Sequence, residues 1–341
     1  MKRMIVLAVL ALSVRAETWK LSTIDSIGDV GRYASIARKF GRTHIAYYDL
    51  TNHDLKYATS IDDLNWTIQV VDSAGDVGQS ASIAVDAKGN PHISYHDATN
   101  HHLKYATKVS TGNWSTFVVD FNSGGDSSSI AVDAAYVVHI SYYNAANTAL
   151  KYAKGKPGNW VLTFVDNNGS VGGGSYIALD KNGFAHVSYL DAVADTLKYA
   201  TNESGAWVIT VVDGNGTVGG ATAITLDSLG NPHIAYNTIN GVRYAHFTAN
   251  GWLTEPVDIT ITTQWPLSIR LNAADLPMIS YNDNIEFALA LARKTTSGAW
   301  TKTIVDTAAG SPIYSSLWEE SGVIRIAYFK STADLSYAIN Q

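Results

Sequence analysis

The sequence predicts an all-β fold, a seven-bladed β-propeller in which each blade has four antiparallel strands. Three observations indicate this fold. A motif of the type His-Ile-Ser-Tyr, or a divergent copy of it, occurs seven times at intervals of 45–48 residues. A tryptophan followed six residues later by an aspartate also occurs seven times. Each repeat unit resolves into four short strand-like segments without helical periodicity, which is typical of propeller blades.

Both repeat series run through nearly the whole chain in one register. The copies of the first motif are Thr43–Tyr47, Pro91–Tyr95, Val138–Tyr142, Ala185–Tyr189, Pro232–Tyr236 and the divergent Pro277–Tyr281 and Ile324–Tyr328. The tryptophan–aspartate pairs are Trp19/Asp25, Trp66/Asp72, Trp114/Asp120, Trp160/Asp166, Trp207/Asp213, Trp252/Asp258 and Trp300/Asp306. A solenoid is less consistent with this pattern, because neither end has the polar capping repeat that a linear array needs.

One unit shows the four expected strands in order. They are Trp66–Asp72, Ser82–Asp86, His92–Asp97 and Leu103–Ala106. The turn between the second and the third contains Gly89, and glycine readily adopts the positive φ that tight turns require.

The two ends of the chain predict how the ring closes. The repeats begin with a tryptophan strand, Trp19–Asp25, and end with a Tyr-Ala strand, Leu335–Ala338. The last unit therefore lacks its tryptophan strand. We expect the N-terminal strand to complete the last blade, which leaves few exposed sheet edges.

Residues that recur in the same slot of most blades are expected to be structural. Five histidines share one slot: His44, His92, His139, His186 and His233. We expect each to be hydrogen-bonded within or between blades, because buried polar groups are usually satisfied. Thirteen of the 19 tyrosines fall in two further slots, and these rings are expected to pack in the core. The aspartates of the Trp-x5-Asp motif are expected to cap turns.

Binding residues are then sought in the loops that emerge on one face of the ring. Carboxylates, amides and histidines outside the shared slot follow the third and precede the fourth segment of several units. The candidate ligand-binding residues of this group are Asp49, Asn52, His53, His96, Asp97, Asn100, His101, His102, Asn144 and Asp191. Their spacing does not require a zinc site, which needs three or four converging ligands. We therefore expect solvated loop histidines and predict no metal, no cofactor and no catalytic residue, with metal binding at these histidines as a minor alternative.

The divergent sixth and seventh units add two candidates near the axis. The innermost strands carry alanine at one slot in the first four units, but Arg270 and Trp318 in the last two. This substitution indicates either sequence drift balanced by local ion pairs or a single asymmetric site in the central depression.

Composition and the N-terminus indicate the cellular setting. The chain is 46% hydrophobic and contains no cysteine, which excludes disulfides and thiolate chemistry. Lys2 and Arg3 precede the apolar run Met4–Val14, so residues 1–16 read as a signal peptide and residues 17–341 as one propeller domain. Removal of the signal peptide leaves 21 basic and 30 acidic residues, a net charge of −9. We therefore expect a secreted or periplasmic monomer that binds neither nucleic acid nor membrane.

The composite repeat, with W-x5-D, S-I-A-V-D-x-x-G-N-P-H-I-S-Y-x-D and L-K-Y-A, resembles the repeats of secreted bacterial seven-bladed propellers. The wider group is similar to sialidase-type and lectin-type propellers. The resemblance covers residues 19–338 and implies the fold more strongly than an activity. The Asp-box turns and the arginine trio of a sialidase are not evident in the sequence.

Three functions remain open at this stage. The first is non-enzymatic binding of a carbohydrate or an extracellular protein through loops on one face. The second is a structural or protein-interaction scaffold. The third is a polysaccharide lyase or glycosidase with a site in the sixth and seventh blades, for which Glu286, Glu319, Glu320, Arg270 and Arg325 are the candidates. A glycosidase needs two carboxyl groups about 5–10 Å apart.

Overall fold

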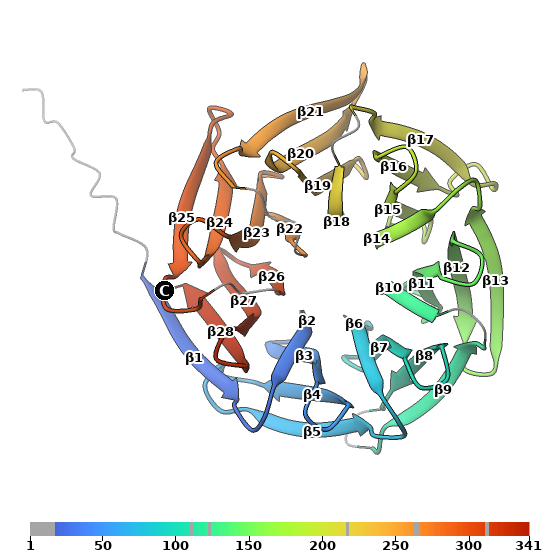
Figure 1. The fold of residues 1–341 in the computed structure, drawn as a ribbon, viewed down its shortest axis with the longest axis vertical. Coiled ribbons are helices and arrows are strands. Elements are labelled where there is room, and N and C mark those ends of the chain that lie inside the picture. Colours follow the sequence, from blue (N-terminus) through green and yellow to red (C-terminus); the bar gives the residue numbers. More distant parts are fainter. Residues whose placement is uncertain are drawn as a thin grey trace, which may run out of the picture.

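A computed structural model describes residues 18–109, 112–121, 124–215, 218–261, 266–310 and 314–340. The expected signal peptide lies outside the described residues. Seven four-stranded antiparallel sheets are arranged around a central axis, which confirms the predicted seven-bladed propeller (Figure 1). No helix occurs in the described part of the chain, and so none there is long and apolar enough to cross a membrane.

Each blade runs outward from an innermost strand. Blade 1 consists of β2 (Val30–Lys39), β3 (Arg42–Asp49), β4 (Asp54–Ser60) and β5 (Thr67–Asp72). Blade 2 consists of β6 (Val77–Val85), β7 (Pro91–Asp97), β8 (His102–Thr107) and β9 (Ser115–Asp120). Blade 3 consists of β10 (Gly124–Val132), β11 (Val138–Asn144), β12 (Ala149–Lys156) and β13 (Asn159–Asp166). Blade 4 consists of β14 (Val171–Leu179), β15 (Ala185–Asp191), β16 (Thr196–Thr201) and β17 (Val208–Asp213).

The remaining blades repeat this order. Blade 5 consists of β18 (Val218–Leu226), β19 (Pro232–Thr238), β20 (Gly241–Thr248) and β21 (Gly251–Asp258). Blade 6 consists of β22 (Ser268–Leu271), β23 (Pro277–Asp283), β24 (Ala288–Lys294) and β25 (Trp300–Asp306). Blade 7 consists of β26 (Ser315–Glu320), β27 (Val323–Lys330), β28 (Asp334–Asn340) and β1 (Trp19–Asp25).

The ring closes as the sequence predicts. Strand β1 pairs antiparallel with β28, and Leu21 lies opposite Ala338 in the register. The first described strand and the last one thus belong to the same sheet, so blade 7 has four strands like every other blade.

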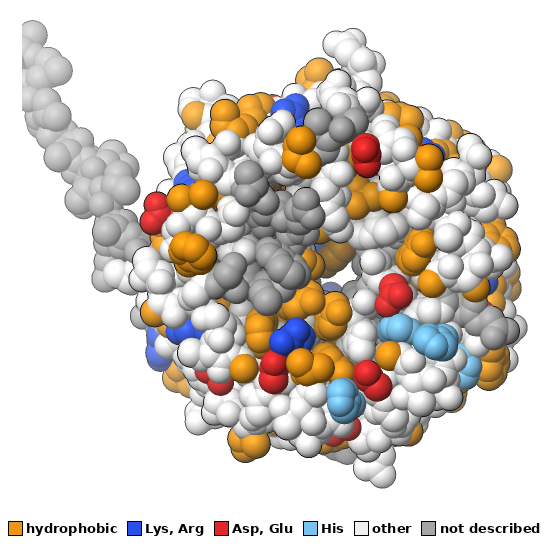
Figure 2. Space-filling view, in the orientation of Figure 1, with side chains coloured by type: hydrophobic (Ala, Val, Ile, Leu, Met, Phe, Trp, Pro, Cys, Tyr) orange, Lys and Arg blue, Asp and Glu red, His pale blue; other side chains and the backbone are white. Residues whose placement is uncertain are grey.

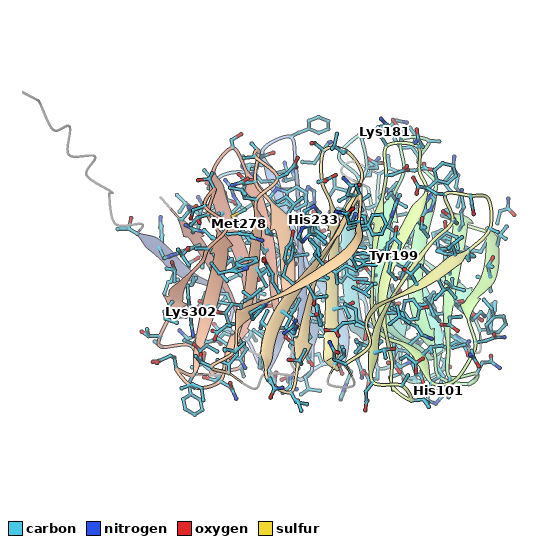
Figure 3. The ribbon with its side chains drawn as sticks, turned by 90° about the horizontal axis from the view of Figure 1, so that it is seen from above. His101, Lys181, Tyr199, His233, Met278 and Lys302 are labelled. Carbon is cyan, nitrogen blue, oxygen red and sulfur yellow. The ribbon has the colours of Figure 1, made fainter. Side chains whose placement is uncertain are left out.

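The propeller has two distinct faces. We call "loop face" the one that carries the loops between the second and third strands of each blade, together with the connections between blades. We call "turn face" the opposite one, with the turns between the first and second strands. His101, in the β7–β8 loop, and Lys181, in the β14–β15 turn, lie at opposite faces (Figure 3).

Neighbouring blades are joined by a buried latch built on the Trp-x5-Asp aspartate. Asp72 accepts hydrogen bonds from Tyr95 Oη at 2.6 Å and from Lys104 Nζ at 2.5 Å, both in the next blade. Burial alone would raise the pKa of Asp72, but these two donors outweigh it and lower the pKa. The same tyrosine bond occurs at Asp25–Tyr47, Asp120–Tyr142, Asp166–Tyr189, Asp213–Tyr236, Asp258–Tyr281 and Asp306–Tyr328. The expected structural role of these aspartates and tyrosines is confirmed.

The innermost strands are joined by serine side chains. Ser82 Oγ accepts a hydrogen bond from the Ile130 N–H of the next blade at 3.2 Å. Equivalent bonds join Ser35 to Ile83, Ser129 to Ile177, Ser268 to Leu317 and Ser316 to Ile36. The innermost strands belong to separate sheets, so a serine hydroxyl of the preceding blade accepts from a backbone N–H that faces it.

The shared-slot histidines are buried and hydrogen-bonded, as expected. His44 Nδ1 lies 2.6 Å from Tyr57 Oη within blade 1. The same pairing occurs at His92–Tyr105, His139–Tyr152, His186–Tyr199 and His233–Tyr244.

Candidate functional site

The four carboxylate and amide candidates at the start of the loop-face loops lie inside the fold. Asp49, Asp97, Asn144 and Asp191 are all buried, with at most 6% of their surface exposed. Asp49 accepts bonds from the backbone N–H and side-chain amide of Asn52, and so holds the tight turn in place. These side chains have little surface to offer a ligand.

The buried carboxylates also contact the lysines of the latch. Lys56 Nζ lies 3.5 Å from Asp49, Lys104 Nζ lies 3.8 Å from Asp97, and Lys198 Nζ lies 2.7 Å from Asp191. Asn100 plays the turn-holding role of Asn52 in blade 2, where its backbone N–H and side-chain amide bond Asp97. Asn52 and Asn100 are themselves exposed, but their amide groups are engaged in these bonds.

The loop-face histidines have different partners. His53 is half-exposed, with its Nδ1 2.9 Å from Tyr48 Oη. His96 is buried, and its Nδ1 lies 3.0 Å from Asp126 of blade 3. His101 is exposed, with its ring centre 6.5 Å from that of His96, and His102 packs edge-on against Phe121. Figure 2 shows histidine side chains gathered on one sector of the face, where Figure 1 draws β6–β11.

Arg270 and Trp318 are brought together at the axis. The Arg270 guanidinium carbon lies 4.7 Å from the centre of the Trp318 ring, and its Nε donates to the Leu317 carbonyl at 3.2 Å. Burial lowers the pKa of Arg270. The two side chains stack on each other in a hollow of about 500 Å³ on the turn-face side of the axis.

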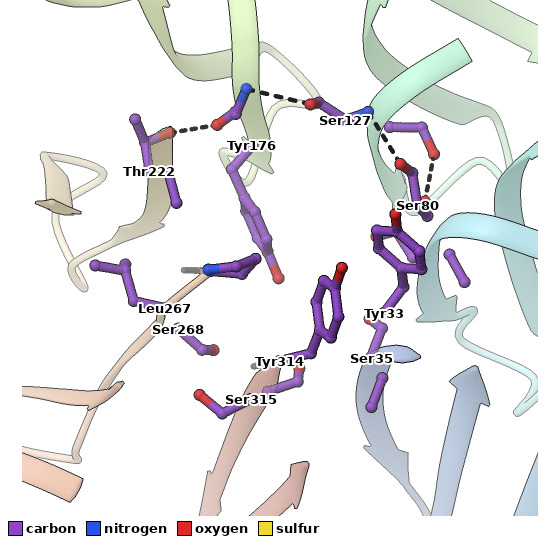
Figure 4. A pocket seen from close by; sticks show the side chains of 18 of the residues that line it. Tyr33, Ser35, Ser80, Ser127, Tyr176, Thr222, Leu267, Ser268, Tyr314 and Ser315 are labelled. Carbon is purple, nitrogen blue, oxygen red and sulfur yellow. Dashed lines mark hydrogen bonds between the residues drawn. The ribbon is translucent and has the colours of Figure 1, made fainter. Parts of the chain in front are cut away.

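A second axial hollow opens toward the loop face, with a volume of about 180 Å³. All seven innermost strands line it, and Tyr33, Tyr176 and Tyr314 project their rings into it (Figure 4). Tyr33 and Tyr314 lie with ring centroids 4.5 Å apart, and Tyr33 has a φ of 54°. Tyr176 lines both axial hollows, so its ring lies between them.

The glycosidase candidates converge only in part: Glu320 lines the turn-face hollow together with Arg270, whereas Glu286, Glu319 and Arg325 do not line it. Glu286 lies in the β23–β24 loop on the loop face, whereas Glu320 ends β26 on the turn face. Glu320 pairs with Arg38 at 2.9 Å, and Arg325 pairs with Asp63 at 2.8 Å. Glu320 and Arg325 thus form local ion pairs, whereas Arg270 stacks on Trp318 and bonds a backbone carbonyl. Glu286 and Glu320 do not form one carboxyl pair.

A different feature repeats between neighbouring blades: an edge-to-face contact of tyrosine and tryptophan, which we call the aromatic corner. The tyrosine comes from the Leu-Lys-Tyr-Ala motif of one blade, or from a divergent copy of it, and the tryptophan from the outer edge of the next, with ring centroids 5.0–5.5 Å apart. The pairs are Tyr57–Trp114, Tyr105–Trp160, Tyr152–Trp207, Tyr199–Trp252, Tyr244–Trp300 and Tyr337–Trp66.

Two of these corners are filled by a lysine of the protein. Between blades 1 and 2, Lys108 Nζ lies 4.8 Å from the Tyr57 ring centre and 5.0 Å from that of Trp114. Gln69 Oε1 accepts from Lys108 Nζ at 2.7 Å and from the Trp114 indole N–H at 3.1 Å. The lysine cation and the glutamine amide therefore cover the aromatic faces of Tyr57 and Trp114. Their polar groups are bonded to each other and to the indole N–H.

The corner between blades 5 and 6 has the same arrangement. Lys294 Nζ lies 5.3 Å from the Tyr244 ring centre and 5.8 Å from that of Trp300. Glu255 takes the place of Gln69, since it accepts from Lys294 and from the Trp300 indole N–H.

Two other corners are open as clefts. Between blades 4 and 5, Thr210 and Phe247 occupy the slots of Gln69 and Lys108, and a cleft of about 580 Å³ extends over Trp252. Phe247 is 42% exposed and packs edge-on against Trp252, with centroids 5.4 Å apart. Polar groups of Asn182 and Asn231 line the same cleft.

The cleft between blades 3 and 4 has the same form. It has a volume of about 460 Å³ and lies over Trp207. Thr163 and Asn202 occupy the slots that hold glutamine and lysine in the closed corners. Aromatic surface beside a few polar groups, in a concave site of this size, is typical of small-ligand sites.

Sequence reasoning did not find these clefts. From the sequence, the tyrosines of the corners are expected in the core, and the tryptophans serve only as markers of the repeat. No function is assigned there to the variable positions at the strand ends. The signal that could have found them is the exchange of Lys108 and Lys294 for Asn202 and Phe247 at one slot of the repeat.

Comparison with known proteins supports the fold. No family model and no curated protein sequence matches the chain. A protein of unknown function from Dyadobacter fermentans is similar in structure, with a TM-score of 0.61, 12% identity, and coverage of 94% of this chain and 97% of that one. The fucose-specific lectin from Aleuria aurantia has a TM-score of 0.55 and 13% identity over 82% of this chain and 96% of its own. The Hadza microbial sialidase Hz136 has a TM-score of 0.52 and 14% identity over 90% of this chain and 65% of its own.

Proposed function

We propose that the protein is a non-enzymatic carbohydrate-binding propeller that holds saccharides in the open clefts over Trp207 and Trp252. The observation that carries this proposal is the contrast between corners of the same repeat. Closed corners cover their aromatic faces with Lys108 or Lys294, whereas the two open ones leave theirs accessible to a ligand.

The chemistry of an open cleft suits a saccharide. A sugar ring presents C–H groups on one face, which pack on an aromatic ring, and hydroxyls along its edge, which need hydrogen-bond partners. Trp252 and Phe247 supply apolar surface. Asn182 and Asn231 supply side-chain carbonyl oxygens, since their amide N–H groups donate to Asp180 and Asp227. Two such clefts in adjacent blades would let one branched or repeating glycan bind twice and gain avidity.

The structural neighbours suggest the first probe. One of them is described as a fucose-specific lectin, so α-methyl-L-fucoside and an array of fucosylated and other glycans are suitable ligands to test. We extend the proposal to a secreted protein, in keeping with the predicted signal peptide. Cleavage after Ala16 would be checked by N-terminal sequencing of the exported protein.

The test exchanges the residues that fill the closed corners for those found at the same positions in the open corners. The double variant Phe247→Lys with Thr210→Gln copies the closed corner into the cleft over Trp252, and Thr163→Trp fills the cleft over Trp207. Each change should remove one binding site, as measured by calorimetric stoichiometry with the best array ligand. The opposite pair, Lys108→Asn with Gln69→Thr, should raise the stoichiometry from two sites to three.

Circular dichroism of each variant serves as the control for folding. An unchanged stoichiometry in the folded closing variants would refute binding in the clefts. Array binding that disappears instead on filling the axial hollow, by Ser80→Trp, would assign the ligand to the axis.

A further inference from the structure

Blade 4 departs from blades 2, 3 and 5 at the shared histidine slot. His186 is 2% exposed, and its Nδ1 lies 2.5 Å from Tyr199 Oη, as in the other blades. Its second ring nitrogen, Nε2, is buried and has no hydrogen-bond partner, which is also true of His44 and His92, although His92 Nε2 lies 3.4 Å from Asp86. A buried polar atom without a partner has a considerable free-energy cost and calls for an explanation.

In three other blades, an aspartate faces the corresponding nitrogen. In blades 2, 3 and 5, Nε2 of the histidine lies 3.3–3.5 Å from an aspartate of the adjacent turn. These pairs are His92–Asp86, His139–Asp133 and His233–Asp227.

In blade 4 a second carboxylate joins the group. Asp180 occupies the aspartate slot, and Glu203 of the β16–β17 loop lines the same cleft. One ligand atom each of Asp180, His186 and Glu203 lies within 4.8 Å of the other two. All three side chains line the cleft over Trp252.

The orientation of His186 suits a metal ligand. Ligation through Nε2 places the ring proton on Nδ1, which then donates it to Tyr199 Oη. Metal-bound histidines commonly donate their other N–H in this way.

Asp180 is held in place by its own turn. Its Oδ1 accepts the backbone N–H groups of Asn182 and Phe184 at 2.9 and 2.8 Å, and its Oδ2 accepts from the Asn182 amide at 3.1 Å. Glu203 is exposed and can move inward by rotation of its side chain. Since zinc–ligand distances are about 2.0–2.2 Å, closure of the three atoms around an ion needs a movement of about 1 Å.

We propose that Asp180, His186 and Glu203 form a binding site for a divalent transition-metal ion of the zinc type at the edge of this cleft. One imidazole and two carboxylates are ligands that such ions accept, and three protein ligands leave a coordination position open toward the cleft. The ion would satisfy His186 Nε2 and balance the two carboxylates. The metal site is inferred independently of the proposed carbohydrate binding, although both ligands would occupy the same cleft.

The experiment measures metal binding by the full protein without any saccharide. Zn²⁺ is titrated by calorimetry, and Co²⁺ is followed by its visible ligand-field absorption, which reports coordination directly. We expect one saturable site, with an affinity reduced at least tenfold by Glu203→Gln, an exposed change that leaves the core intact. His186→Gln should abolish the Co²⁺ band.

The matched control is His92→Gln, which removes the same slot and the same tyrosine bond in a blade with one carboxylate. It should leave Zn²⁺ affinity unchanged. The proposal is overturned by an absence of saturable binding, by unaltered affinity in folded Glu203→Gln, or by a loss of binding in His92→Gln.

Discussion

Acidification should destabilise the protein through its buried histidines, and His44 allows the effect to be worked out. Burial, with a contribution from the nearby Arg42, Lys108 and Arg38 cations, lowers the pKa of His44 from 6.5 to about 4. Between pH 6.5 and 4 the unfolded chain therefore binds a proton that the folded protein does not. The free energy of unfolding accordingly falls as the pH is lowered through this window.

The size of the effect follows from the two pKa values. A shift of about 2.5 units corresponds to about 3 kcal/mol when the pH is well below both values. Between pH 7 and pH 4.5 the loss attributable to His44 alone is about 2 kcal/mol. The pKa values of His92, His139, His186 and His233 are also lowered by burial, so the whole protein should show a larger loss.

Equilibrium urea unfolding at several pH values between 7 and 4.5 measures this dependence. The variant His44→Gln should be less stable at pH 7 but should lose about 2 kcal/mol less on acidification than the parent. Tyr47→Phe is the control, because it weakens the latch without removing a histidine and should retain the parental pH dependence. Parallel pH profiles for His44→Gln and the parent would refute the reasoning.

Two further predictions concern the architecture. Asp72→Asn removes the charge that faces the buried Lys104 and should lower the free energy of unfolding by about 2–4 kcal/mol, whereas Tyr95→Phe should cost about 1.5–3 kcal/mol. Urea unfolding checks both, and a change below 0.5 kcal/mol for either would contradict the latch. Deletion of residues 18–25 removes β1 and exposes the edge of β28, so the shortened protein should melt earlier and aggregate. Differential scanning fluorimetry with light scattering tests this expectation, and an unchanged melting temperature would argue against closure by β1.

The fold could be predicted because the same contacts between neighbouring blades recur in each repeat unit. The Trp-x5-Asp spacing is constant since each aspartate must reach a tyrosine of the next blade, as Asp72 reaches Tyr95. The ring closure could be predicted for the same reason, because the last unit lacked the strand that Trp19–Asp25 supplies.

The position of the candidate site could not be predicted from the same repeats. Asp49 and Asp97 stand in loops in the sequence, yet lysines from the neighbouring strand and the turn's own amides hold them inside. Their burial depends on packing between strands that sequence periodicity does not describe.

The clefts could not be predicted because they are marked only by the absence of the lysine that fills the same corner between other blades. In the sequence, Asn202 and Phe247 are variable residues at the ends of strands. The structure shows that Lys108 and Lys294 occupy the same position in the closed corners. The proposed metal site likewise depends on Glu203, which lies in a variable loop and meets His186 only in the folded chain.

The measurement that tests the central claim most directly is a crystal structure of the protein with the saccharide that binds best on the glycan array. We predict electron density for the sugar in the clefts over Trp207 and Trp252, with the sugar ring packed on exposed aromatic surface, and none at the closed corners over Trp114 and Trp300. Density confined to the axial hollow or to the loop-face loops would contradict the account.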